Sequence, residues 1–137
     1  MNSEFVYINE VGPRDGLQNQ KTILSSGIRL DLINHLIDAK IPGIEVASFV
    51  SPKAVPAMEG AREIIQGLVD TKGCEISVLV PNMKGFEMAS EAGAEIITVV
   101  PSATETMNQK NINMGLEETV KSSCNIIKSA KSSNLRT

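Results

Sequence analysis

The sequence is poor in the residues that recognise nucleic acids. It contains no tryptophan and one tyrosine, and its formal net charge is −3 at pH 7. Bases stack on aromatic side chains and phosphates attract clustered lysine and arginine, so we expect no nucleic-acid partner. There is no run of about 18 apolar residues, so we expect no membrane partner. Because no signal sequence precedes the first apolar run, the expected location is the cytoplasm.

Cysteine and histidine are also scarce. Cys74 and Cys124 are 50 positions apart and form neither a zinc motif nor a thioredoxin-like motif. Two unpaired cysteines fit a reducing cytosol. Cys124 lies at helical spacing from Val120 and Ile127, which predicts a buried thiol. The one histidine, His35, is expected on the solvated face of a helix, away from any catalytic group.

Apolar runs alternate with amphipathic stretches along the chain, which we interpret as one domain covering residues 1–137. The predicted strands are Phe5–Val11, Ile44–Ala47, Ile76–Val80 and Ile96–Val100. Helices are predicted from Ser25 or Ser26 to about Pro42, in the later half of Pro52–Asp70, over Lys84–Ala92 with a C-cap at Gly93, and over Leu116–Ala130. The polar tail that follows is expected to end without a fifth strand.

The helices are expected to bury apolar faces. The predicted inward residues are Ile28, Leu32, Leu36 and Ile37 in the first helix, Ala61, Ile64, Ile65 and Leu68 in the second, and Phe86 and Ala89 in the third. Four βα repeats give a parallel sheet with right-handed crossovers. Such a sheet is either an open doubly wound sheet or half of an eight-stranded barrel. No glycine-rich dinucleotide turn follows the first strand, which argues against the open sheet.

Polar residues cluster where each predicted strand ends. These residues are Arg14, Asp15, Gln18 and Asn19, then Glu45 and Ser48, then Asn82 and Lys84, and finally Ser102, Thr104 and Glu105. The carboxyl ends of parallel strands share one face of a sheet, and barrel enzymes carry out their chemistry on that face. The sequence therefore predicts one composite site.

The stretch Val11–Asn19 is the most informative part of this site. Gly12-Pro13 ends the first strand, and Gly16 is expected to permit a tight turn. Arg14 is able to bind an oxyanion and Asp15 to bind a hard metal ion. The alternative is that these two side chains pair with each other, or that Asp15 makes a local turn hydrogen bond.

A carboxylate within the apolar run Ile44–Ala47 needs a partner, because burying an unpaired charge is costly. For Glu45 that partner is either Arg14 or a water at a metal site. The lysines near these loops either meet an anionic substrate or are solvated; they are Lys21, Lys53, Lys84 and Lys110.

Four blocks of sequence resemble the N-terminal half of a 3-hydroxy-3-methylglutaryl-CoA lyase. The four blocks are Gly12-Pro13-Arg14-Asp15-Gly16-Leu17-Gln18-Asn19, Ala47-Ser48-Phe49-Val50-Ser51-Pro52-Lys53, Pro81-Asn82-Met83-Lys84-Gly85-Phe86-Glu87 and Lys110-Asn111-Ile112-Asn113. Leu17 favours the lyases over the related acyl-transferring synthases, which typically carry Glu there. The resemblance implies an α/β fold with about four of the eight βα units of a TIM barrel.

The resemblance also implies a reaction and a set of roles. The reaction is cleavage of an acyl-CoA substrate, 3-hydroxy-3-methylglutaryl-CoA, to acetoacetate and acetyl-CoA, in leucine breakdown or ketone-body formation. Asp15 would bind Mg²⁺ or Mn²⁺, Arg14 would stabilise the enolate oxygen, and Glu45 would belong to the polar shell around both. The implied substrate contacts are Arg14, Gln18, Ser48 and Lys21. The expected assembly is a homodimer.

The chain lacks other parts of the family pattern. It contains no His-x-His pair and no glycine-rich loop with a cysteine, and barrels of this type need roughly 250 residues. Three interpretations remain open. The chain is part of a lyase and inactive alone, or an inert half-barrel that self-associates, or a relative of the acyl-CoA-dependent synthases.

Overall fold

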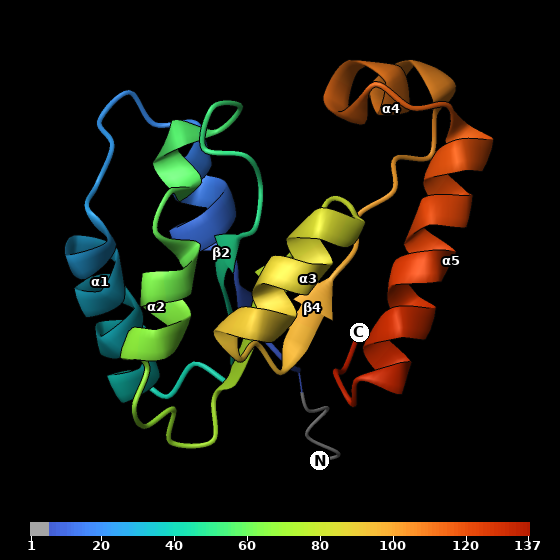
Figure 1. The fold of residues 1–137 in the computed structure, drawn as a ribbon. Helices are drawn as coiled ribbons and strands as arrows, with labels where there is room; N and C mark the ends of the chain where they lie inside the picture. Colours follow the sequence, from blue (N-terminus) through green and yellow to red (C-terminus); the bar gives the residue numbers. More distant parts are fainter. Residues whose placement is uncertain (1–5) are drawn as a thin grey trace, which may run out of the picture.

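Parallel strands and helices alternate along the chain (Figure 1). The structure, a computed structural model, describes residues 6–137. The strands are β1 (Asn9–Glu10), β2 (Gly43–Ser48), β3 (Glu75–Leu79) and β4 (Ile96–Thr98). The helices are α1 (Ser26–Asp38), α2 (Ala61–Gly67), α3 (Met83–Ala92), α4 (Glu105–Ile112) and α5 (Leu116–Ser132), with short helical turns η1 (Gly12–Gly16) and η2 (Pro56–Met58). The predicted alternation is confirmed, and α4 is an additional helix that was not predicted.

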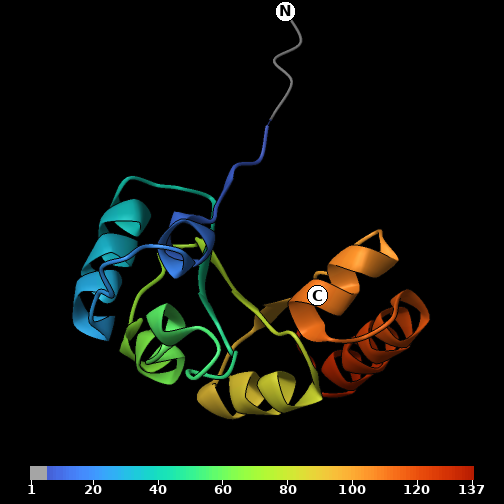
Figure 2. The same cartoon turned by 90° about the horizontal axis from the view of Figure 1, so that it is seen from above.

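The sheet contains the four strands in sequence order, β1-β2-β3-β4, and every neighbouring pair is parallel. A doubly wound sheet reverses its strand order at a switch point, whereas a barrel does not. Seen from above, α1, α2, α3 and α5 form an arc outside the sheet (Figure 2). The architecture is therefore that of a partial barrel.

The first strand is shorter than predicted. Only Asn9 and Glu10 pair with β2, opposite Gly43 and Ile44, and Phe5 lies outside the described residues. Because β1 lies at the edge of the sheet, the residues before it have no strand on their other side. Val6 and Ile8 are accordingly 73% and 58% exposed.

The core lies between the sheet and its helices. All six residues of β2 are buried, as are the predicted core residues Ala61, Ile64, Phe86 and Ala89. Gly93 ends α3 with a φ of 92°, as its predicted C-cap role requires. The predicted strand and helix positions therefore place most of the core correctly.

The predicted apolar face of α1 is partly wrong. Ile28 is 55% exposed and Leu32 37% exposed, whereas Ile33 and Ile37 are buried together with Arg29. The Arg29 guanidinium donates from Nη1 to the carbonyl oxygen of Glu59, 2.9 Å away, and burial lowers its pKa. An arginine occupies a core-facing position, so hydrophobic periodicity gave the wrong face.

The C-terminal segment also differs from the prediction. Helix α5 buries Thr119, Ile126 and Ala130, so Cys124 is exposed rather than buried. After α5, Arg136 forms a parallel bridge with Ile96 at the outer edge of β4. Its amide donates to the Glu95 carbonyl at 2.9 Å. This contact is an isolated bridge, so the described residues contain no fifth strand, as predicted.

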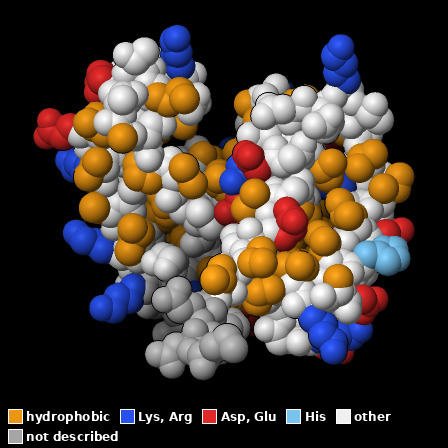
Figure 3. All heavy atoms as spheres, turned by 180° about the vertical axis from the view of Figure 1, so that it is seen from behind, with side chains coloured by type: hydrophobic (Ala, Val, Ile, Leu, Met, Phe, Trp, Pro, Cys, Tyr) orange, Lys and Arg blue, Asp and Glu red, His pale blue; other side chains and the backbone are white. Residues whose placement is uncertain are grey.

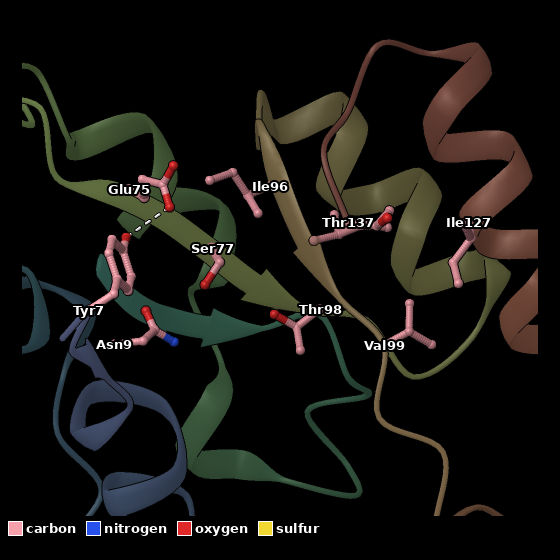
Figure 4. A pocket seen from close by; sticks show the side chains of 10 residues that line it. Tyr7, Asn9, Glu75, Ser77, Ile96, Thr98, Val99, Ile127 and Thr137 are labelled. Carbon is pink, nitrogen blue, oxygen red and sulfur yellow. Dashed lines mark hydrogen bonds between the residues drawn. The ribbon is translucent and has the colours of Figure 1, made fainter. Parts of the chain in front are cut away.

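A polar network joins both ends of the described chain at the amino end of the sheet. The Tyr7 hydroxyl donates to Glu75 Oε2 at 2.8 Å (Figure 4), and Arg136 Nη2 donates to Glu75 Oε1 at 2.6 Å. The hydrogen bond from Tyr7 and, to a smaller extent, the hydrogen bond from Arg136 lower the pKa of Glu75. The network therefore fixes the segment before β1 and the segment after α5 to the start of β3.

Within the described residues, no helix has the length and apolar character to cross a membrane.

Gly85→Ala should destabilise the chain. An added Cβ would lie 2.5 Å from the backbone carbonyl oxygen of Phe49, so α3 must move away from the chain after β2. We expect the free energy of unfolding to fall by about 1–3 kcal/mol in urea titrations. Gly27→Ala is the control: the nearest atom is 3.9 Å away, so stability should be unchanged or rise by up to about 1 kcal/mol. Equal effects would contradict this packing.

The Glu75 network should make stability depend on pH. Because the folded-state pKa of Glu75 is lowered, its contribution is present above the ordinary carboxyl pKa and is lost as pH falls through the folded value. We expect Glu75→Gln to flatten the fall in unfolding free energy between about pH 5 and pH 3. Tyr7→Phe should flatten it partly. Parallel curves for Glu75→Gln and the unaltered chain would contradict the prediction.

Candidate active site

A cavity of about 350 Å³ opens at the carboxyl ends of the strands. Five predicted residues line it: Arg14, Asp15, Gln18, Ser48 and Ser102. Pro81 and Asn111, from two other sequence blocks, also line it. The segments after all four strands therefore converge, as the sequence pattern predicts, and α4 and α5 close one side.

The turn η1 presents Arg14 and Asp15 to this cavity. The Val11 carbonyl accepts hydrogen bonds from the amides of Arg14, Asp15 and Gly16 at 3.1, 2.7 and 3.4 Å. The Glu10 carboxylate accepts from the amide of Gly12 at 2.6 Å. These bonds make η1 helical, and among the described residues Gly16 is not one of the glycines with positive φ. The chain therefore turns at Gly16 within a π-helical turn and without a positive φ.

Arg14 binds two carboxylates at once. Its Nη1 lies 2.7 Å from Asp15 Oδ1, and its Nε forms an ion pair with Glu45 Oε1. The Glu45 side chain is 3% exposed, Arg14 13% and Asp15 56%. The buried carboxylate thus has its predicted arginine partner. Both side chains of the inner pair are held in place, while Asp15 remains accessible from the cavity.

A bulge in β2 places Glu45 and Ser48 on the same side of the sheet. Glu45 pairs with Ser77, but the register then shifts, so that Ser48 pairs with Leu79. Side chains alternate between the two faces, and Ser77 and Leu79 share one face. The extra residue in β2 therefore turns Ser48 to the face that carries Glu45. Its Oγ is buried and has no hydrogen-bond partner among residues 6–137.

Asn108 is a structural residue of the site that the sequence analysis missed. Its side chain is buried and binds Ser102 twice: Oδ1 accepts from the Ser102 amide and Nδ2 donates to the Ser102 carbonyl, both at 3.0 Å. This clamp fixes the segment after β4 against α4. Thr104, whose hydroxyl accepts from the Met107 amide at 3.4 Å, caps α4 and was the available signal for it.

Several predicted residues lie elsewhere. Asn82 caps α3 by accepting from the Gly85 amide at 2.9 Å, and Glu105 accepts from the Leu116 amide at 2.6 Å. The lysines Lys21, Lys53, Lys84 and Lys110 are exposed, and none of them lines the cavity. His35 is exposed on α1, with Nδ1 2.8 Å from the Asp31 carbonyl oxygen.

A family model described as HMGL-like matches residues 5–137. The chain belongs to the HMGL-like family. The human mitochondrial hydroxymethylglutaryl-CoA lyase is 45% identical over 130 residues, which are 95% of this chain and 40% of the relative. The human cytoplasmic 3-hydroxy-3-methylglutaryl-CoA lyase is 43% identical over 132 residues, 96% of this chain and 36% of the relative.

Solved structures of the HMGL-like family show the same fold. The lyase from Brucella melitensis superposes with a TM-score of 0.92 at 41% identity, over 97% of this chain and 47% of that chain. The lyase from Acinetobacter baumannii, solved with coenzyme A and 3-methylmalate, superposes with a TM-score of 0.85 at 34% identity. The superposition covers 93% of this chain and 42% of that lyase chain. The fold is thus a partial TIM barrel, and the chain spans less than half the length of these relatives.

The oxygen donors in the cavity at the carboxyl ends of the strands fit a divalent cation only in part. Asp15 supplies one accessible carboxylate. Ser48 lines the same cavity, and its buried Oγ has no partner among the described residues. Among residues 6–137 no group of three or more His, Cys, Asp and Glu side chains is gathered as a metal site. Hard oxygen donors suit Mg²⁺ or Mn²⁺, but further ligands are needed to complete a coordination sphere.

Arg14→Met should destabilise the chain far more than Asp15→Asn. Removing the arginine leaves the Glu45 carboxylate buried without its cation, and we expect a loss of about 3–5 kcal/mol in unfolding free energy. The exposed Asp15 contact should contribute less than about 1 kcal/mol. Urea unfolding followed by circular dichroism measures both. Adding Glu45→Gln to Arg14→Met should restore part of the loss, and no restoration would contradict the charge argument.

Proposed function

We propose that this chain supplies the Arg14–Asp15 part of a lyase site that cleaves 3-hydroxy-3-methylglutaryl-CoA to acetoacetate and acetyl-CoA. The observation that carries the proposal is the arginine held between a buried and an accessible carboxylate at the edge of the cavity. The relatives named as lyases of this substrate support the choice of reaction.

The reaction breaks one carbon–carbon bond. The 3-hydroxyl group loses its proton and becomes the ketone of acetoacetate, and the bonding electron pair moves to the acetyl-CoA fragment. That fragment leaves as a thioester enolate and is then protonated at carbon. Negative charge therefore develops on the thioester oxygen, and a fixed cation next to it lowers the barrier. Arg14 fits this role, because Glu45 restrains the guanidinium before the substrate arrives.

Asp15 is proposed to hold a divalent cation, Mg²⁺ or Mn²⁺, through its accessible carboxylate. When bound, such a cation supplies Lewis-acid polarisation of substrate oxygens. Gln18 and Ser48 line the cavity and are proposed to contact the substrate. The exposed Lys21 is proposed to contact the anionic part of the acyl-CoA rather than the reacting carbons.

The chain alone is expected to be inactive, because one carboxylate holds Mg²⁺ weakly and the chain contains no His-x-His pair. The relatives are named as mitochondrial and as cytoplasmic enzymes, so the cytoplasmic location remains a prediction. A homodimer remains a prediction as well.

A chimera tests the proposed reaction. The part of the human mitochondrial lyase that lies beyond the alignment is joined after Thr137, and cleavage of 3-hydroxy-3-methylglutaryl-CoA is measured with Mg²⁺ or Mn²⁺. We expect turnover by the chimera and none by the isolated chain. Asp15→Ala should abolish turnover through loss of metal affinity. Arg14→Lys, which keeps a cation beside Glu45, should lower kcat about 100-fold with a smaller change in KM.

The matched control for these variants is Lys53→Ala, an exposed lysine that does not line the cavity. It should leave kcat and KM unchanged. A folded chimera without turnover would overturn the proposed reaction. A pure KM effect in Arg14→Lys would overturn the enolate role of Arg14.

A further inference from the structure

Helix α4 forms one wall of the cavity at the carboxyl ends of the strands. Asn108, Asn111 and Ile112 line this cavity, and their spacing of three and four positions places them on one face of the helix. Arg14 and Asp15 line it from η1. Seen from above, η1 and α4 lie on opposite sides (Figure 2). The space-filling view from behind shows a hollow between the lobe that contains α4 and α5 and the lobe that contains α1 (Figure 3).

Few side chains anchor this wall to the rest of the chain. Asn108, which is 1% exposed, is the only buried residue of α4; Ile112 is half-buried and the remaining residues of the helix are exposed. The first turn is held to α5 by Glu105, whose carboxylate accepts from the Leu116 amide at 2.6 Å. Most helices in proteins are stabilised by the packing of an apolar face. Because α4 has no such face, its orientation depends on a small number of hydrogen bonds.

The clamp between Asn108 and Ser102 determines which face of α4 meets the cavity. Its two hydrogen bonds, both 3.0 Å long, join the side-chain amide to the backbone N–H and C=O groups of Ser102, in the segment after β4. Because the two bonds run in different directions, rotation of α4 about its axis would break at least one of them. Asn111 and Ile112 lie one turn further along the same face, so such a rotation would also move them away from the cavity.

We infer that Asn108 is a positioning residue for substrate binding. It holds the wall formed by Asn111 and Ile112 across the cavity from Arg14, so that the substrate meets a preformed surface. This inference rests on the proposed function, because the ligand of the cavity is taken to be 3-hydroxy-3-methylglutaryl-CoA. Both polar atoms of the Asn108 side chain are already bonded to Ser102, so Asn108 acts through the wall and not on the reacting atoms.

This role predicts a separation between binding and chemistry. When a wall is in place for only part of the time, the apparent affinity falls by that fraction. Arg14 and Glu45 are held by η1 and β2, which do not depend on α4. Loss of the clamp should therefore raise KM and leave kcat nearly unchanged, as is typical when binding is lost equally from the ground state and the transition state.

The chimera with the C-terminal part of the human lyase measures this separation. Asn108→Ala removes the clamp and keeps a good helix former, and we expect KM to rise about tenfold and kcat to change by less than about twofold. Met107→Ala is the matched control: Met107 is 50% exposed on the same helix and does not line the cavity, so neither constant should change. An unchanged KM in Asn108→Ala, or a fall in kcat alone, would overturn the inference.

Hydrogen exchange in the isolated chain tests the clamp without any turnover. Asn108→Ala should accelerate exchange of the α4 amides at least about tenfold and leave the amides of β2 and β3 unchanged, because only the local opening of α4 becomes easier. Equal exchange of α4 in both proteins would overturn the inference. Faster exchange throughout the chain would overturn it as well, because Asn108 would then support the whole fold and not the wall.

Asn108→Asp provides a rescue that depends on pH. An ionised carboxylate accepts from the Ser102 amide but cannot donate to the Ser102 carbonyl, whereas a protonated carboxyl group does both. Burial disfavours the ionised form. The KM of this variant, divided by that of the unaltered chimera at the same pH, should be high at about pH 8 and approach one near about pH 5. Arg14, Asp15 and Glu105 are present in both proteins, so the ratio removes their contribution. A ratio that does not fall with pH would overturn the inference.

The proposed reaction and the role of Asn108 can fail separately. If the chimera binds the substrate without cleaving it, the reaction is wrong, and the Kd of the intact substrate, measured by calorimetry, replaces KM. A rise in Kd of about tenfold in Asn108→Ala would then still support the positioning role, and an equal Kd would overturn it. A folded chimera that neither binds nor cleaves the substrate would overturn both.

Discussion

The ion pair between Arg14 and Glu45 is the constraint on which the rest of the site depends. Two charges removed from water are costly unless each has a well-placed partner, and here the partners come from η1 and from the buried strand β2. The hydrogen bonds that gather on the Val11 carbonyl fix η1, and thereby bring the guanidinium to the carboxylate. The position of Asp15 is a consequence, because it follows Arg14 in the same turn.

Those parts of the structure that depend on local chemistry are predictable from the sequence. The caps at Ser25 and Gly93 are confirmed, because capping uses one residue and its near neighbours. The partner of Glu45 was predictable too, since a carboxylate in an apolar run must be neutralised and Arg14 was a nearby cation. The converging loops followed from the rule that parallel strands share their carboxyl ends.

The errors come from features that periodicity cannot distinguish. Arg29 occupies a core-facing position in α1 because a backbone carbonyl receives its guanidinium, and no hydropathy pattern indicates that. Helix α5 has two apolar stripes, and its sequence does not show which of them faces the sheet. Helix α4 has little apolar character, and it is held by the amide of Asn108 and by its cap at Thr104. The burial of Arg29 depends on a contact between distant parts of the chain, whereas α4 depends on polar contacts between near neighbours, which a search for apolar periodicity does not register.

The bulge in β2 affects how this strand should be compared with those of other proteins. Three positions of sequence separate Glu45 from Ser48, but on the neighbouring strand only the two positions from Ser77 to Leu79 separate their partners. A related strand with one residue fewer between the carboxylate and the hydroxyl would therefore present both groups in the same place. Positions at this site are therefore equivalent when they pair with the same residues of the neighbouring strand. An alignment that counts residues alone would treat such a relative as having lost either the carboxylate or the hydroxyl.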